Sequence, residues 1–233
     1  MKAINGNIAL TCYLTNRIDP QRHVRWKTDD DAAVATWIRS LTRCGLRGVI
    51  FHDNLSEGFC ERWASDNVAF QQVQWRTLWS AAEERVRIYR DWLRDNPCEW
   101  VLTTDLSDVE FYQNPFPLIN DPAVLYIGSE PALIGRTILK KWMLRAYGEV
   151  LFGDRPVLNP GIVGGHGKTL LAFLNQWLDE MERAIQPTPP PHDIVAFNRL
   201  VYRENIPFVT GHPLHTVFRL NESSDKGAAI RHK

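Results

Sequence analysis

The chain alternates between short apolar runs and longer segments in which apolar residues recur every three or four positions. Short runs of this kind are typical of strands, and the longer spacing is typical of amphipathic helices. Strands are predicted at residues 7–13, 46–53, 67–75, 100–104, 109–112, 123–128 and 215–220. Helices are predicted from about residue 28 to 44 and at residues 75–95, 133–147, 168–185 and 192–205.

The order of these elements indicates how they pack. Apart from the successive strands at residues 46–53 and 67–75, strands and helices alternate along the first hundred residues, which is typical of a mainly parallel sheet with helices on both faces. Residues 46–53, LRGVIFHD, contain a near-continuous apolar run, as expected for a strand buried on both faces. We therefore expect an α/β fold in a single domain, residues 1–233, with ligands bound beyond the carboxyl ends of the strands.

Composition and charge narrow the possible functions. The chain has 233 residues, 44% of them hydrophobic, which is enough for one large core. Lys and Arg (27) balance Asp and Glu (27), so no overall charge attracts nucleic acid or an anionic membrane, and no nucleic-acid partner is expected. The four cysteines show no CxxC spacing, and no signal peptide or transmembrane segment is predicted. We therefore expect reduced thiols and a cytoplasmic location.

Two aspartates mark the end of the strand predicted at residues 100–104. Asp105 follows it directly, and Asp108 comes three residues later. Carboxylates at the end of a buried strand are costly unless a cation neutralises them, and hard oxygen ligands suit Mg²⁺ or Mn²⁺. The alternative is that Asp105 caps a turn while Asp108 pairs with an arginine. The spacing alone leaves both interpretations open.

The residues around the aspartates resemble a known motif. After the strand, the chain reads Asp105, two residues, Asp108, valine, an aromatic residue two positions further and then Asn-Pro-Phe. This region resembles the metal-binding region of glycosyltransferases with the GT-A fold, where an Asp-x-Asp type motif holds a nucleotide-sugar donor through a divalent cation. Here the spacing is Asp-x-x-Asp, so Leu106 occupies the place of the first aspartate.

The resemblance carries several implications. It implies a GT-A-like (Rossmann-like) fold with a small C-terminal β segment, and a hexosyltransferase-type activity. It also implies Mn²⁺ or Mg²⁺ as cofactor and a nucleotide-diphosphate sugar as donor. The acceptor is left open among a glycan, a lipid-linked sugar and a small molecule, and the retaining or inverting outcome is left open too.

A glycine-rich segment and one further aspartate extend the resemblance. Asn159, Gly161, Gly164 and Gly165 resemble the Asn-x-Gly segment that lines the sugar and phosphate pocket in this superfamily. A loop between a strand and a helix is the alternative interpretation of these glycines. Asp193 resembles an aspartate that faces the transferred sugar or the acceptor, which makes it the candidate catalytic residue.

The last residues also resemble the superfamily. His232 resembles a C-terminal histidine that serves as a third metal ligand beside Asp105 and Asp108, and Lys233 a lysine near the diphosphate. The alternative is a frayed tail without a role. Asp53, at the end of the strand at residues 46–53, is a candidate for binding the donor's nucleoside.

Three other functions are suggested by parts of the sequence. The segment GIVGGHGKT is similar to the phosphate-binding loop GxxxxGK[ST], but its first glycine is one position out of register, which argues against a P-loop enzyme. A metal-dependent nuclease or phosphatase remains an alternative, because Asp105, Asp108 and Asp193 could hold two ions. A non-catalytic nucleotide-sugar-binding domain is the third possibility.

Overall fold

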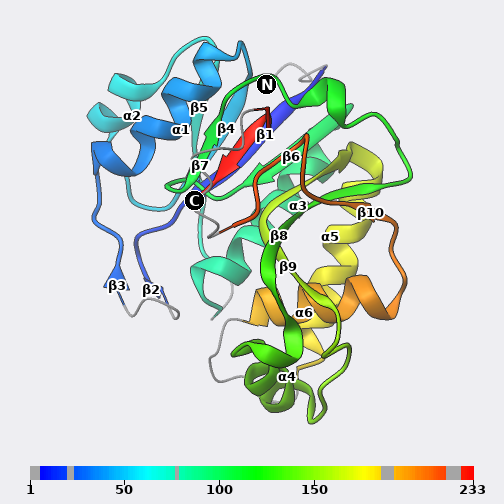
Figure 1. Ribbon diagram of the computed structural model, residues 1–233. Coiled ribbons are helices and arrows are strands. Elements are labelled where there is room, and N and C mark those ends of the chain that lie inside the picture. Colours follow the sequence, from blue (N-terminus) through cyan, green and yellow to red (C-terminus); the bar gives the residue numbers. More distant parts are fainter. Residues whose placement is uncertain (1–5, 20–23, 77–78, 185–191, 219–226) are drawn as a thin grey trace.

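The computed structural model describes residues 6–19, 24–76, 79–184, 192–218 and 227–233. Within these ranges the protein is α/β, with a seven-stranded central sheet and helices on both of its faces (Figure 1). The prediction of a mainly parallel, Rossmann-like sheet is confirmed. None of the described helices combines the length and apolar character needed to cross a membrane.

The strand order of the sheet is β10-β8-β9-β6-β1-β4-β5. Only β9 runs antiparallel to its neighbours among these described strands. Their bounds are β1 Ile8–Tyr13, β4 Gly48–His52, β5 Val68–Gln72, β6 Trp100–Thr104, β8 Leu125–Leu133, β9 Pro156–His166 and β10 Phe208–Val209. The parallel strands β1, β4, β5 and β6 therefore end at one edge of the sheet.

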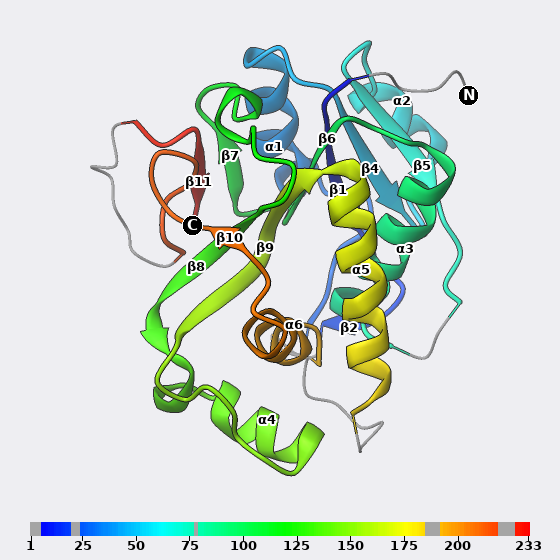
Figure 2. The ribbon, with the colours of Figure 1, turned by 90° about the vertical axis from the view of Figure 1, so that its right-hand side faces the viewer.

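Helices cover the two faces in separate groups. One buried cluster joins the sheet to α3, α5 and α6, and another joins its other face to α1 and α2 (Figure 2). The fourth helix, α4, packs on α6 outside these layers. The helices are α1 Asp31–Arg43, α2 Glu57–Trp63, α3 Ala81–Asp95, α4 Leu139–Tyr147, α5 Gly167–Glu182 and α6 His192–Arg203, with short 3₁₀ turns at Phe116–Leu118 and Ile134–Arg136.

Two small strand pairs lie outside the main sheet. β2 (Ile18–Asp19) and β3 (Val24–Arg25) form an antiparallel hairpin. β7 (Val109–Phe111) pairs antiparallel with β11 (Ile230–His232), so two segments that lie far apart in the sequence become neighbours. β11 thus forms a small C-terminal β segment, although not at the residues predicted for a strand there.

Several predicted boundaries are wrong. α3 begins at Ala81 rather than at residue 75, because Glu83 accepts a hydrogen bond from the Ser80 N–H (2.8 Å) and so caps the helix there. The helix predicted at residues 133–147 begins only at Leu139, after a 3₁₀ turn. The strand predicted at residues 215–220 is absent over its described part, where His215 forms only an isolated bridge to Ile230; residues 219–220 lie outside the described ranges.

The segment containing Asn159 and Gly161 is a strand, so the alternative of a loop between strand and helix is wrong. The register between β8 and β9 shifts here: Ile127 pairs with Val163, but Gly128 pairs with Asn159. The residues between form a β-bulge, in which the Asn159 side-chain oxygen accepts the Gly161 N–H (2.7 Å). The bulge directs the Gly161 carbonyl to the backbone N–H of Asp105 (2.8 Å).

A buried asparagine joins α6 to the same strand. The Asn198 side chain accepts the Leu158 N–H and donates to the Leu158 carbonyl, both at 2.8 Å, and also donates to the Ile194 carbonyl (2.9 Å). Asn198 is fully buried. These bonds hold the first turn of α6, which carries Asp193, against β9.

We expect Asn198→Ala to destabilise the protein strongly, because it leaves the N–H and C=O of Leu158 without this partner in the interior. Each such loss costs about 1–3 kcal/mol, so the free energy of unfolding measured with denaturant should fall by about 3 kcal/mol. Asn175→Ala is the control, since this amide donates to the Leu171 carbonyl on an exposed part of α5. Equal losses in the two variants would contradict this role of Asn198.

Candidate metal and ligand site

Three potential metal ligands converge at the carboxyl end of β6. Asp105 follows β6, Asp108 precedes β7, and His232 lies in β11 opposite Val109 of β7. One ligand atom from each side chain lies within 4.8 Å of the others, and the Asp105 Oδ2 to His232 Nε2 distance is 3.7 Å. The three predicted metal ligands are therefore brought together, although 127 positions separate Asp105 from His232 in the numbering.

His232 is held firmly rather than frayed. Its side chain is buried (1% exposed), its backbone N–H donates to the Thr216 hydroxyl (2.9 Å), and its ring stacks on Phe218 with centroids 4.4 Å apart. Neither ring nitrogen has a hydrogen-bond partner among the described residues. A buried polar atom without a partner is costly, and coordination of an ion through Nε2 would satisfy it. The donor set therefore fits a divalent cation.

Gly161 makes room for this cluster. A Cβ added there would lie 2.5 Å from Asp105 Oδ2 and 2.5 Å from His232 Cε1, closer than real Cβ contacts. The β9 bulge thus places a residue without a side chain where carboxylate and imidazole approach the backbone. Close packing against the two ligands explains the glycine here.

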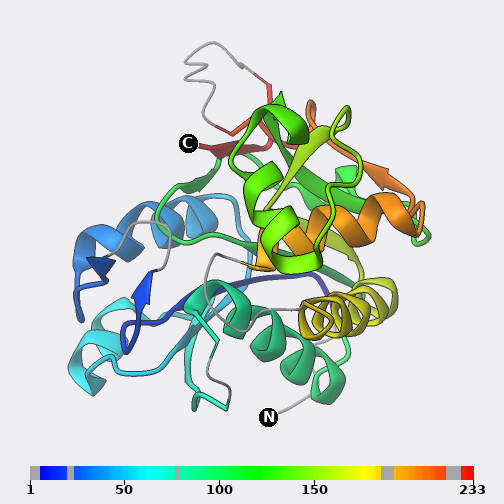
Figure 3. The same cartoon turned by 90° about the horizontal axis from the view of Figure 1, so that it is seen from below.

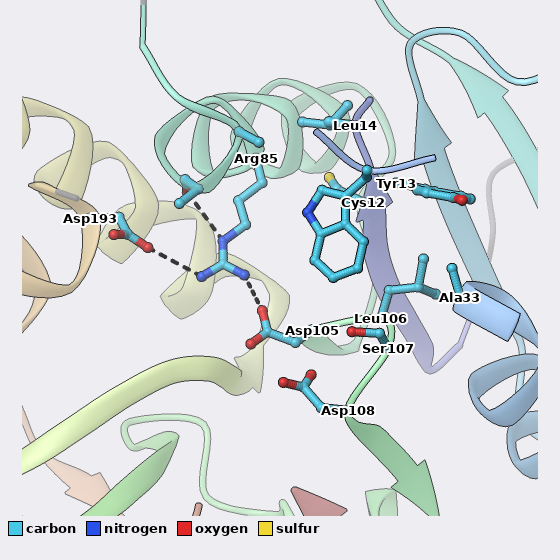
Figure 4. Close-up of a pocket in the computed structure, with 13 residues that line it drawn as sticks. Cys12, Tyr13, Leu14, Ala33, Arg85, Asp105, Leu106, Ser107, Asp108 and Asp193 are labelled. Carbon is cyan, nitrogen blue, oxygen red and sulfur yellow. Dashed lines mark hydrogen bonds and ion pairs between the residues drawn. The ribbon is translucent and has the colours of Figure 1, made fainter. Parts of the chain in front are cut away.

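A buried arginine connects the cluster to the catalytic candidate. Arg85, on α3, donates through one guanidinium nitrogen to Asp105 Oδ1 and through another to Asp193 Oδ2 (3.3 Å), as Figure 4 shows. Its Nε donates to the Ala82 carbonyl (3.1 Å), which fixes the orientation of the guanidinium group. Asp105 therefore uses one oxygen for Arg85 and keeps Oδ2 on the side of His232. Asp193 Oδ1 is buried and has no hydrogen-bond partner within the described part of the chain.

At both carboxyls, burial raises the pKa and Arg85 lowers it. Burial alone would raise the pKa of Asp105, but Arg85 and then His232 outweigh it, so this pKa lies well below its usual range. For Asp193 burial wins and raises the pKa to about 6, although Arg85 opposes the change. Asp105 is therefore ionised, while the Asp193 carboxyl titrates closer to neutral pH.

One pocket is lined by Arg85, Asp105, Asp108 and Asp193. It lies beyond the carboxyl end of β1 and beside the first turn of α3, with Asp105 and Asp108 on one wall and Asp193 on another (Figure 4). Its lining residues are Cys12, Tyr13, Leu14, Trp26, Ala33, Ala81, Ala82, Arg85, Asp105, Leu106, Ser107, Asp108 and Asp193. The wall thus combines charged groups with an aromatic and aliphatic surface.

Asp53 lies outside this pocket and shapes a neighbouring hollow. Its carboxylate accepts hydrogen bonds from the backbone N–H groups of Thr15 (2.9 Å) and Asn16 (3.0 Å) and from the Trp75 indole (2.6 Å). Asp53, Asn16 and Trp75 line the hollow together. Both carboxylate oxygens of Asp53 therefore already accept hydrogen bonds. Two of the donors are backbone N–H groups of the loop after β1, so Asp53 fixes this loop.

The other predicted donor-binding residues on β9 are Asn159, Gly164 and Gly165. Gly164 and Gly165 are inside the sheet, where an added Cβ would meet Leu102 Cδ1 at 2.8 Å and Leu125 Cδ2 at 3.3 Å respectively, so strand packing explains both glycines. Asn159 donates to Glu130 Oε1 (2.8 Å) and holds the bulge beside Asp105.

Lys233 follows His232 but points elsewhere. Its Nζ lies 3.5 Å from Glu110 Oε2, while its backbone N–H donates to the Asp108 carbonyl (2.9 Å). Glu110 also accepts a hydrogen bond from Arg231 (2.6 Å). Since side chains alternate along a strand, Arg231 and Lys233 lie on the face opposite to His232.

Sequence reasoning missed Arg85. It is one of four arginines on α3, together with Arg87, Arg90 and Arg94. Arg87 pairs with Glu84 and Asp91, and Arg94 pairs with Asp95, so arginine content and spacing do not distinguish the residue that reaches the site. The only signal was the need of Asp105 for a cationic partner.

No known protein-family model matches this chain, and no curated protein sequence is significantly similar to it.

Because the pKa of Asp193 is raised, its negative charge is expected to destabilise the folded protein as the pH rises. A carboxyl whose folded pKa is raised stabilises the folded state below its unfolded pKa, near 4, and this contribution is lost as the pH rises through about 6. As the pH rises from about 4.5 to about 8, the stability of Asp193→Asn relative to the parent should therefore increase by about 2 kcal/mol. Denaturant unfolding at both pH values measures the difference. Glu182→Gln, at an exposed position of α5, controls for net charge, and a pH-independent effect of Asp193→Asn would contradict the assignment.

Proposed function

We propose that this chain is a metal-dependent glycosyltransferase of the GT-A type, which transfers a sugar from a nucleotide-diphosphate donor to an acceptor hydroxyl. The observation that carries the proposal is the buried imidazole of His232 beside Asp105 and Asp108 at the carboxyl end of a strand. Two carboxylates favour Mn²⁺ or Mg²⁺, and the imidazole favours Mn²⁺ of the two. The pocket next to the cluster provides space for the donor.

Different residues of the site would bind the cation and hold its ligands in place. When bound, the cation would neutralise negative charge that develops on the leaving diphosphate. Asp105 Oδ2, Asp108 and His232 Nε2 would hold it, and Gly161 leaves space for them. Arg85 keeps Asp105 ionised and fixes which of its oxygens faces the cluster.

Asp193 is the candidate for acting on the sugar or the acceptor. Its Oδ2 is held by Arg85, while its buried Oδ1 has no partner in the described residues, so a substrate hydroxyl would supply the missing hydrogen bond. A pKa of about 6 suits a group that accepts a proton near neutral pH. Both a general base and a stabilising carboxylate fit this geometry.

The two-ion nuclease or phosphatase is less compatible with the site. It requires Asp193 to share a metal with Asp105, but Arg85 lies between these carboxylates and bonds to both. A guanidinium there already supplies the positive charge that a second cation would bring. One ion, beside Arg85, is the arrangement that the charges support.

A donor screen tests the proposal. Nucleotide-diphosphate sugars with different bases and sugars are incubated with the protein and Mn²⁺, and the released nucleoside diphosphate is measured. We expect release from at least one donor, and loss of this release with a chelator or in Asp108→Ala. Cleavage of phosphate esters without any release from nucleotide sugars would favour the phosphatase alternative. Donor binding without turnover would favour a non-catalytic domain.

His232→Gln and Lys233→Ala form a matched pair for calorimetry with Mn²⁺ and the diphosphate product. Loss of one charge-assisted contact weakens binding about ten- to a hundredfold, which we expect for His232→Gln. Lys233→Ala should have little effect, because its ammonium lies beside Glu110. Similar affinities for His232→Gln and the parent would remove His232 from the site, and a large loss in Lys233→Ala would restore its predicted diphosphate contact.

A further inference from the structure

The connection from β8 to β9 forms a separate projection. Residues 134–155, here called the α4 lobe, leave the sheet and return to it, and the Ile134 N–H to Arg155 carbonyl bond (2.9 Å) closes the neck. Figures 1 and 2 show α4 at the lower end of the molecule, and Figure 3 shows it facing the viewer from below. The lobe is thus exposed on its outer side.

The lobe concentrates positive charge in a chain whose net charge is zero. Five basic and two acidic residues lie between positions 134 and 155, which gives 5 − 2 = +3. One of the acidic residues, Glu149, is turned toward Arg199 of α6 (3.2 Å). The basic residues, all exposed, are Arg136, Lys140, Lys141, Arg145 and Arg155.

Large apolar side chains lie among these charges. Leu139 and Met143 are buried against Ile194 of α6 and anchor the inner face of α4. On the outer side, Ile138 is 49% exposed and Leu144 is 54% exposed. Because positions three or four apart share a helix face, Ile138, Lys141 and Leu144 follow one another along the outside.

The β2–β3 hairpin has the same character on the same side of the molecule. Ile18 (56% exposed) and Val24 (47% exposed) are open to solvent, and the neighbouring Arg25 is exposed. Four of the six large hydrophobic residues that are exposed in the described part of the chain thus lie on the hairpin and on the α4 lobe, at the lower side in Figure 1.

We propose that the outer face of the α4 lobe binds an anionic lipid surface. Lys140, Lys141 and Arg145 would contact the headgroups, while Ile138 and Leu144 enter the boundary between headgroups and acyl chains. This combination of cationic and aliphatic side chains on one amphipathic helix face is what interfacial binding requires. Single-stranded nucleic acid instead favours exposed aromatic side chains as stacking partners, and the exposed large side chains of the lobe are aliphatic.

Co-sedimentation with vesicles tests this surface in the 233-residue chain without donor or metal ion, so the result is independent of glycosyl transfer. We expect binding to phosphatidylcholine vesicles that contain phosphatidylglycerol, weakened by salt, and little binding to phosphatidylcholine alone. Each basic residue near an anionic surface strengthens binding about fivefold, so Lys140→Glu with Lys141→Glu should weaken it by at least about tenfold. Leu144→Ser should also weaken it, at unchanged charge.

Arg47→Glu with Lys168→Glu is the matched control. Both residues are exposed, near the amino ends of β4 and β6 at the opposite end of the sheet, and the net charge changes equally. Equal losses in the two double variants would contradict a specific surface, as would equal binding to neutral and anionic vesicles. Tight binding of single-stranded RNA, lost only in the Lys140/Lys141 variant, would assign the lobe to nucleic acid instead. Unchanged melting temperatures verify that the variants fold.

Discussion

The buried ion pair between Arg85 and Asp105 is the interaction on which the site depends. A carboxylate at the end of a buried strand is stable only with a cationic partner, and Arg85 supplies it from α3. The same guanidinium reaches Asp193 on α6 and leaves Asp105 Oδ2 on the side of His232. One arginine therefore links three elements. It holds the pKa of Asp105 low, whereas burial outweighs it at Asp193 and raises that pKa.

Long-range backbone pairing supplies the rest of the site. β7 continues from Asp108, and its pairing with β11 carries His232 into the cluster. On the other side, the β9 bulge brings Gly161 against both ligands, and Asn198 holds α6 to the residue just before the bulge. The strand pairing, the bulge and the Asn198 hydrogen bonds each fix a backbone segment, so the side chains meet without relying on flexible loops.

The sequence could predict the parts of this arrangement that follow from local pattern. The strand before Asp105 is visible from its apolar run, and its carboxyl end is where parallel sheets bind ligands. The register of β11 on β7 depends on pairing between distant segments, so the burial of His232 could not be read from spacing. The bulge in β9 was equally hidden, since a glycine-rich strand and a loop look alike in sequence. Arg85 was missed because only tertiary packing selects it among the arginines of α3.

In the proposed site, Asp105, Asp108 and His232 jointly bind one divalent cation. Anomalous diffraction from crystals grown with Mn²⁺ and a nucleoside diphosphate tests it most directly. We predict one anomalous peak within about 2.5 Å of an oxygen of each aspartate and of His232 Nε2, in contact with the diphosphate. A peak elsewhere, or a diphosphate bound at this site with no peak between the three side chains, would contradict the claim.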